Sequence, residues 1–285
     1  MFNQSEKKKI PILMYHSISH SAQQKFKQFC VSPLLFAEHM GYLWQHGFTT
    51  LTVTQFVQMR VQGKDRLPAR PVILTFDDGY ADFFTEALPV LQRFGFVATL
   101  YVATAFINGT SGWMQHQGEG ARLMLTWDQI IEISKCGMEI GAHSHRHHQL
   151  DILPLAVARD EVVQCKEMLE DRLGQEVLSF SYPYGYHSAT TQCLVRDAGY
   201  TSACAVKYEM NTQTPDPFSL ARLMASADTS VEALAALLAQ PSPLAITTMY
   251  KDARIPVWRL VRRFSNLRGS IYKQSGSAAS TISLR

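Results

Sequence analysis

Short apolar runs alternate with longer amphipathic segments along the chain, and this alternation constrains the fold more than any other feature of the sequence. Six runs are predicted strands: residues 10–16 (IPILMYH), 71–76 (PVILTF), 95–102 (GFVATLYV), 137–143 (GMEIGAH), 176–183 (EVLSFSYP) and 200–206 (YTSACAV). Four segments are predicted helices: 33–47, 83–95, 126–137 and 155–174. Strands that alternate with helices favour a parallel sheet covered by helices. The sequence therefore predicts an α/β fold, either a (β/α) barrel or an open sheet.

Composition excludes several classes of protein. A chain of 285 residues with 46% hydrophobic residues can bury one large core or two small ones. A net charge of +3, without a basic patch interleaved with aromatics in the first 240 residues, argues against nucleic-acid binding. The five cysteines are widely spaced and form no CxxC pair, so we expect neither a disulfide framework nor a thiolate zinc site. The short apolar segment near the N-terminus does not resemble a signal peptide, and no apolar run reaches about 18 residues, so we expect a cytoplasmic protein.

Polar clusters follow three of the predicted strands. Asp77 and Asp78 follow the run 71–76, the cluster HSHRHH at 143–148 follows 137–143, and YPYG at 182–185 ends the run 176–183. In parallel α/β folds, reactive residues gather at the carboxyl ends of the strands. Three such clusters are more than turn formation requires. The glycine-rich segment 108–124 breaks the pattern, and we expect it to form an irregular loop near the same rim.

The adjacent carboxylates of Asp77 and Asp78 have two interpretations. Asp-Asp-Gly is a common turn sequence, in which both side chains would be exposed to solvent. If the pair is buried, the two like charges require a compensating positive charge.

The histidine cluster also leaves alternatives open. His143 and His147 are four residues apart, and on one face of a helical turn they could bind a metal ion. His145 and His148 form a rival pair, and a solvated cluster without metal is the third interpretation. Asp77 or Asp78 would complete a His-His-Asp set with positions left open for water and substrate.

These motifs resemble those of the polysaccharide deacetylases of the NodB-homology, carbohydrate esterase family 4 type. The resemblance runs from about Ile10 to Leu238: TFDDGY at 75–80 resembles the first motif, HSHRH at 143–147 contains the second, and SYPYG at 181–185 resembles the third. It implies a distorted (β/α) barrel of about seven strands. It also implies an enzyme that hydrolyses N-acetyl groups on an amino-sugar saccharide.

The resemblance assigns roles to residues of this chain. Asp78, His143 and His147 would bind one divalent metal ion, most simply zinc, with cobalt, nickel and manganese as alternatives. Asp77 would be the general base. The backbone N–H of Tyr184, between Pro183 and Gly185, would face the developing oxyanion.

Two departures from the family pattern lead to further predictions. Ser181 stands where the third motif often has an arginine, and Arg222 could orient Asp77 in its place, although an ordinary ion pair of Arg222 is an equal alternative. The late Leu-x-x-His motif is missing near the C-terminus, but LMYH at 13–16 has the same form. This position resembles a circularly permuted subgroup and makes His16 the candidate acid.

The domain boundary and the partners follow from the same resemblance. We expect residues 1–250 to form the deacetylase domain and 251–285 to be a basic tail, whose interleaved arginines and large apolar residues suit a membrane surface. A disordered segment or a packing helix is an equally good interpretation of residues 251–285.

The expected partner is an N-acetylated saccharide, lipid-linked if the tail contacts a membrane. The alternatives are an inactive carbohydrate-binding protein of the same fold, and an O-deacetylase or deformylase of glycans; Trp113 and Trp127 are expected to be core or loop anchors.

Overall fold

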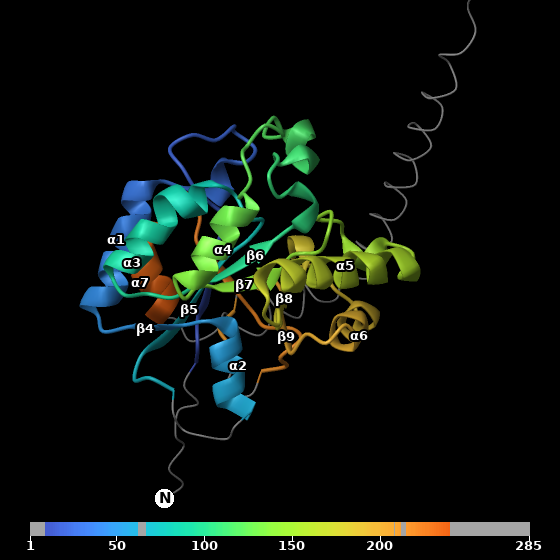
Figure 1. Ribbon diagram of the computed structural model, residues 1–285. Helices are drawn as coiled ribbons and strands as arrows, with labels where there is room; N and C mark the ends of the chain where they lie inside the picture. The colour runs from blue at the N-terminus through green and yellow to red at the C-terminus, as the bar shows by residue number, and fades with distance from the viewer. Residues whose placement is uncertain (1–8, 62–66, 208, 212–214, 240–285) are drawn as a thin grey trace, which may run out of the picture.

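The main sheet contains eight parallel strands at the centre of the molecule (Figure 1). The computed structural model describes residues 9–61, 67–207, 209–211 and 215–239. The strands are β1 (Ile12–Tyr15), β4 (Thr49–Leu51), β5 (Pro71–Phe76), β6 (Thr99–Val102), β7 (Glu139–Ala142), β8 (Ser179–Ser181), β9 (Ser202–Cys204) and β10 (Leu223–Met224). Their order is β10-β1-β5-β6-β7-β8-β9, with β4 paired to β5. All six predicted strands are confirmed, whereas the predicted tail 251–285 lies outside the described residues.

Residues 220–224 close this sheet into a distorted barrel. Leu220 bridges Cys204 of β9, and three residues later Leu223 pairs with Leu13 of β1. One short segment therefore contacts both edges of the sheet. The predicted distorted (β/α) barrel is confirmed, and the segment that closes it was not among the predicted strands.

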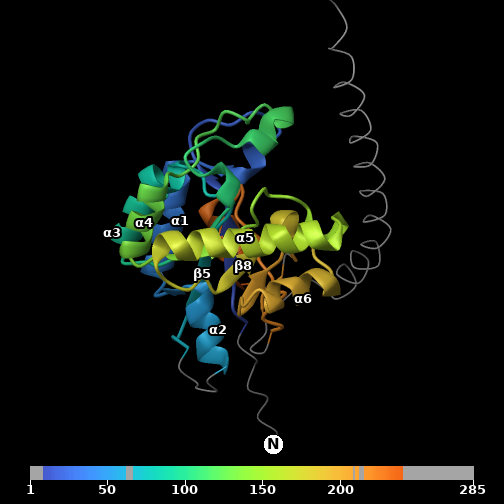
Figure 2. The same ribbon diagram turned by 45° about the vertical axis from the view of Figure 1, so that its right-hand side comes forward.

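Seven helices of the described chain surround the barrel (Figures 1 and 2). They are α1 (Pro33–Gln45), α2 (Val53–Val61), α3 (Leu88–Arg93), α4 (Trp127–Lys135), α5 (Leu155–Leu173), α6 (Ala189–Asp197) and α7 (Val231–Ala239). The four predicted helices are present, although the second begins as a π-helical turn at Phe83–Ala87 before α3. Local signals fix their ends: the Ser32 side chain caps α1, Thr126 and Gln129 form a capping box on α4, and Gly174 ends α5 in a left-handed conformation.

Side chains of each strand alternate between the helices and the barrel interior. Leu13 and Leu74 belong to the core beneath the helices, whereas Ile12 and Ile73 point inward. The inner apolar cluster is completed by Phe56 of α2, which is fully buried at the lower end of the barrel and contributes about 1.5–3 kcal/mol by its burial. Asp77 has the same parity as Ile73, so its side chain reaches the interior at the carboxyl end.

The remaining elements lie at the rim. β2 (Ser17–Ile18) pairs with β3 (Cys30–Val31), and the segment 108–124 contains one 3-10 turn, Gly112–Gln117. In the described part of the chain, no helix combines the length and the apolarity needed to cross a lipid bilayer.

Candidate active site

Asp77 and Asp78 are buried at the end of β5. Asp77 is only 3% exposed and Asp78 only 5%, so the interpretation as a solvent-exposed turn is wrong. The backbone does turn sharply there, because Asp78 and Gly79 both have positive φ values, 79° and 85°. This turn points the two adjacent carboxylates at different partners.

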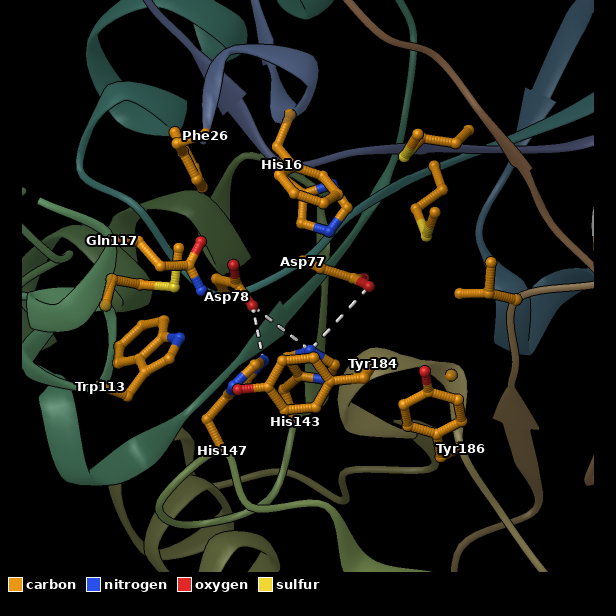
Figure 3. Close-up of a pocket in the computed structure, with 16 residues that line it drawn as sticks. His16, Phe26, Asp77, Asp78, Trp113, Gln117, His143, His147, Tyr184 and Tyr186 are labelled. Carbon is orange, nitrogen blue, oxygen red and sulfur yellow. Dashed lines mark ion pairs between the residues drawn. The ribbon is translucent and has the colours of Figure 1, made fainter. Parts of the chain in front are cut away.

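Asp78 lies against both histidines that the family resemblance selects. Its Oδ1 atom is 3.0 Å from His147 Nε2 and 3.4 Å from His143 Nε2. One ligand atom from each of the three side chains lies within 4.8 Å of the other two, and all three residues are buried. Figure 3 shows these side chains converging on one side of the cavity.

The two histidines converge without a helical turn, which corrects the predicted geometry. His143 directly follows β7, and the next residues are irregular. Ser144 and His147 have positive φ values of 61° and 57°, and these two left-handed residues turn the chain so that the rings of His143 and His147 lie next to each other. Their ring centroids are 4.9 Å apart.

The rival histidine pair points elsewhere. His145 Nδ1 lies 2.9 Å from the Thr104 hydroxyl, and His148 Nδ1 lies 3.2 Å from the carboxylate of Glu161 on α5. Glu161 also accepts a hydrogen bond from the backbone N–H of Arg146. These contacts support the loop from outside and leave His143 and His147 to face Asp78.

The hydrogen bonding of His143 suits a metal ligand. Its Nδ1 donates to the carbonyl oxygen of Ser181 at 2.7 Å, so Nε2 is the ring nitrogen that faces Asp78. Burial alone would raise the pKa of Asp78, but His147 and His143 hold it well below its usual value, so the carboxylate is ionised. Two imidazoles and one carboxylate with open positions fit a divalent metal ion such as zinc.

Asp77 has its own cationic partner. Arg222 Nη1 and Nη2 donate to its two carboxylate oxygens at 2.7 and 2.8 Å, and the arginine is fully buried inside the barrel. The guanidinium also donates to Ser181 Oγ at 2.9 Å and to the carbonyl of Ala205 at 3.1 Å. Burial would raise the pKa of Asp77, but Arg222 and then His143 outweigh it, and the pKa is lowered. The structure therefore pairs the Arg222 guanidinium with the Asp77 carboxylate, and Ser181 adds one hydrogen bond to the same guanidinium.

His16 enters the cavity from the end of β1. Its ring lies 4.9 Å from that of Phe29, and its Nδ1 atom is buried without a hydrogen-bond partner among the described residues. Burial lowers the pKa of His16, and the carboxylates of Asp78 and Asp77 oppose that shift. The imidazole is therefore near two carboxylates and has a ring nitrogen without a partner.

A cavity of about 310 Å³ joins these groups. Tyr184, in the turn Pro183–Gly185, lines it from the end of β8 with a positive φ of 60° and remains 45% exposed. The Tyr184 ring lies 4.8 Å from that of His147. Seven of the nine predicted site residues line this cavity, whereas Arg222 lies in the barrel interior and Pro183 precedes Tyr184 in the same turn. Their catalytic roles, and the permuted position of the acid, stay predictions.

The sequence did not indicate one wall of the cavity. Figure 3 shows Phe26, Trp113 and Gln117 on this wall and Tyr186 on the opposite side, and Phe29 and Met114 also line the cavity. Trp113 was expected to be only an anchor, yet its ring lies 5.0 Å from that of the predicted metal ligand His147. The available signal was the glycine-rich loop 108–124 at the rim, which gave no indication of which side chain faces inward.

The chain is similar to known deacetylases in sequence and in fold. Residues 64–203 match the family model for polysaccharide deacetylase. The Bacillus subtilis (strain 168) protein YxkH, whose name assigns it to the polysaccharide deacetylases, is 29% identical over 231 residues, covering 81% of this chain and 76% of that protein. The poly-beta-1,6-N-acetyl-D-glucosamine N-deacetylase of Escherichia coli (strain K12) is 26% identical over 141 residues, 48% of this chain and 20% of that protein.

A solved structure extends the likeness to most of the chain. The Streptococcus pyogenes deacetylase PplD, in complex with acetate, matches with a TM-score of 0.71 and 25% identity, covering 82% of this chain and 100% of that chain. In sequence and in fold, the chain contains a polysaccharide deacetylase domain of the NodB type.

Proposed function

We propose that the protein is a metal-dependent hydrolase that removes N-acetyl groups from an amino-sugar saccharide. One observation carries the proposal: the buried set Asp78, His143 and His147 lies beside a second carboxylate, Asp77, that has its own guanidinium partner. A purely structural ion-pair network does not require two separately compensated carboxylates at one strand end. A hydrolase that needs one carboxylate for the ion and one for the proton does.

Asp77 would remove a proton from the attacking water. A divalent ion held by Asp78, His143 and His147 would supply a Lewis acid and lower the pKa of a water molecule. Arg222 keeps Asp77 ionised and, through two hydrogen bonds, fixes the plane of its carboxylate. The base is thereby charged and oriented before substrate arrives.

His16 would protonate the leaving amine, because an amide nitrogen leaves poorly as an anion. Burial lowers the pKa of His16, and Asp78 and Asp77 partly offset that shift toward the protonated form that the acid role requires. The N–H of Tyr184 would donate to the developing oxyanion, and the products would be acetate and a free amino sugar.

The cavity favours a neutral sugar as substrate. Apart from the aspartates and histidines of the site, the described residues that line the cavity carry no charge, and several are aromatic. Its volume of about 310 Å³ is near the lower end of the ~300–1,000 Å³ typical of small-ligand sites, which suits one sugar unit of a longer chain. We therefore propose an N-acetylglucosamine-type saccharide, the class that the name of the Escherichia coli relative specifies.

Acetate release tests the proposal. The purified protein is stripped of metal with a chelator, reloaded with zinc or cobalt, and incubated with N-acetylated and O-acetylated saccharides and with N-formylated amino sugars. We expect acetate from an N-acetylated saccharide only after reloading, and a loss of about 10²–10⁴-fold in Asp77→Asn with metal retained. The matched control is Asp128→Asn, at an exposed position in the first turn of α4.

The other outcomes separate the alternatives. Tight glycan binding with bound metal and no acetate release would identify a binding protein of the same fold. Release from O-acetyl or N-formyl substrates alone would identify an O-deacetylase or a deformylase. Equal activity of Asp77→Asn and the unsubstituted protein would contradict the base assignment.

A further inference from the structure

Arg122 connects three segments at the rim of the barrel: the stretch after β1 that contains Ser17 and Ser21, the stretch around Asp82, and its own loop 108–124. The proposed chemistry involves none of these contacts. Arg122 lies near the end of the loop 108–124, and its side chain is only 12% exposed. In Figures 1 and 2 this loop, in green, lies beside the dark blue segment that follows β1 at the top of the molecule. The two segments form the upper wall of the cavity.

The guanidinium binds polar groups of all three segments. Nη1 donates to Ser17 Oγ at 3.1 Å and lies 3.5 Å from Asp82, which follows the Asp77–Asp78 turn. Nη2 donates to the carbonyl of Ser21 at 2.9 Å and to Glu119 of its own loop at 3.1 Å. Glu119 in turn accepts a hydrogen bond from the backbone N–H of Gln23.

The same guanidinium also packs on aromatic rings. It lies 4.8 Å from the ring centroid of Phe26 and 5.7 Å from that of Tyr80. A planar guanidinium can donate along its edge while stacking by its face, which a lysine ammonium cannot do. Arg122 therefore holds these segments in one arrangement.

The cavity wall depends on that arrangement. Phe26 touches Arg122 on one side and lines the cavity on the other, and Trp113 and Gln117 line it from the loop that Arg122 fastens. Trp113 also lies 6.3 Å from Tyr80, the second ring under the guanidinium. The loop folds tightly, since a Cβ at Gly120 would lie 2.8 Å from Gln115 Cα. Movement of the Arg122 contacts would therefore displace Trp113 and Gln117.

We propose that Arg122 is a positioning residue for saccharide binding, which holds the Phe26–Trp113–Gln117 wall at a fixed place opposite Tyr184. This inference rests on the proposed function and adds the residue that sets the fit of the sugar. Arg122 contacts none of the predicted metal ligands or Asp77, so its loss weakens substrate binding and leaves metal affinity and turnover in place.

The test compares Arg122→Gln with the unsubstituted protein on a β-1,6-linked N-acetylglucosamine oligomer. We expect KM to rise about tenfold or more with kcat and zinc content unchanged, since binding contacts are lost equally in ground and transition states. Quenching of Trp113 fluorescence by iodide, with Trp113→Phe as the reference, should increase in Arg122→Gln. Arg122→Lys should recover part of the KM, because it keeps the charge but not the planar contacts.

The matched control is Arg70→Gln. Arg70 also stacks on an aromatic ring, Phe48, at 4.3 Å and donates to a backbone carbonyl, but it precedes β5 at the opposite end of the barrel. Its replacement should leave KM and Trp113 quenching unchanged. If Arg122→Gln does not fold, Glu119→Gln, which removes one partner of Arg122, should give a smaller shift of the same kind.

The outcomes distinguish this inference from the proposed function. Absence of acetate release by the unsubstituted protein overturns the proposed function, and the quenching of Trp113 still tests the position of the wall. Acetate release with an unchanged KM in Arg122→Gln, or equal Trp113 quenching in both proteins, overturns the positioning role. A parallel loss of zinc and kcat would also overturn it, because that pattern indicates general damage to the site.

Discussion

The two ends of the barrel treat left-handed backbone positions differently. At the amino ends of the strands, such positions follow helices and are glycines, as at Gly137 after α4 and Gly174 after α5. At the carboxyl ends, they include all five non-glycine residues of the described chain with positive φ: Asp78, Asn108, Ser144, His147 and Tyr184. A non-glycine residue in this conformation costs about 1–2 kcal/mol.

The difference shows where stability and function diverge. At the amino ends, the local sequence matches the local conformation, and these turns only reverse the chain. At the carboxyl ends, residues of the candidate site and its rim occupy positions that glycine would fill at lower energy. Exchanges at the two ends should therefore have opposite signatures in activity and in stability.

The largest effect on activity is expected for Asp78→Asn. Asparagine tolerates the left-handed backbone and has the same shape, so the exchange removes only the charge that faces His143 and His147. We expect zinc affinity to fall more than about 100-fold, beyond the 10–100-fold typical of residues that only support ligands, and acetate release to fall with it. Zinc content after dialysis measures the change, with Asp171→Asn on the exposed face of α5 as the control. Unchanged zinc binding would remove Asp78 from the ligand set.

Arg222→Met should damage both stability and activity. The exchange leaves Asp77 buried without a counter-charge, and we expect the free energy of unfolding of the metal-free protein to fall by about 3–5 kcal/mol at neutral pH. Chemical denaturation measures this loss, and Arg222→Lys, which keeps the charge, should lose less. A fully stable Arg222→Met would show that the ion pair is not needed.

The same exchange has a pH signature with a defined sign. The pKa of Asp77 is lowered because Arg222 outweighs the effect of burial, so the pair stabilises the fold above the unfolded value of about 3.9 and loses this contribution as pH falls through the folded pKa. Without Arg222, burial dominates and the pKa rises. The proposed mechanism requires an ionised Asp77, so the acid limb of kcat/KM should move to higher pH, as a pH–rate profile would show.

His16→Gln should slow turnover without removing metal. The imidazole lies in the cavity but outside the Asp78, His143 and His147 set, and loss of a general acid costs about 10²–10⁴-fold. Zinc content and acetate release measured together test this expectation. Full activity would make the permuted position of the acid wrong.

The smallest effects test the backbone comparison directly. Gly137→Ala meets no atom within 4 Å, so only the backbone conformation should count, and we expect a loss of about 1–2 kcal/mol with unchanged activity. Ser144→Gly should gain up to about 1 kcal/mol, because it relieves a left-handed residue whose buried hydroxyl has no partner among the described residues. Urea unfolding of both variants decides the comparison, and a loss of stability in Ser144→Gly would contradict it.

The sequence predicts the fold where an element carries its own signal. The apolar run of β5 is six residues long and fully buried, and α5 ends at a glycine, so both were predicted. β10 has only two residues and exists because Leu223 and Met224 pair with β1, which no local pattern indicates. α7 was not predicted either, because its sequence VEALAALLA is apolar along most of its length and lacks the polar face that marks a surface helix.

The site was predictable to the extent that its residues follow strands. Asp77 continues the inward parity of β5, and His143 directly follows β7, so position along the strand places both. His147 reaches the site through a left-handed turn that its spacing does not indicate. Trp113 belongs to a loop whose position depends on Arg122 contacts with Ser17 and Ser21, 105 and 101 residues away, and such long-range contacts are not visible in a sequence pattern.

The closing segment 220–224 also sets when the site is completed during synthesis. Asp77 and Arg222 are 145 positions apart, which at about 5–20 residues per second corresponds to roughly 7–29 s of translation. Both aspartates and both histidines are made before the guanidinium that compensates Asp77 and before the segment that joins β9 to β1. A nascent chain stalled short of Arg222 therefore contains Asp78, His143 and His147 but lacks the counter-ion of Asp77, which joins the site only when the barrel is nearly complete.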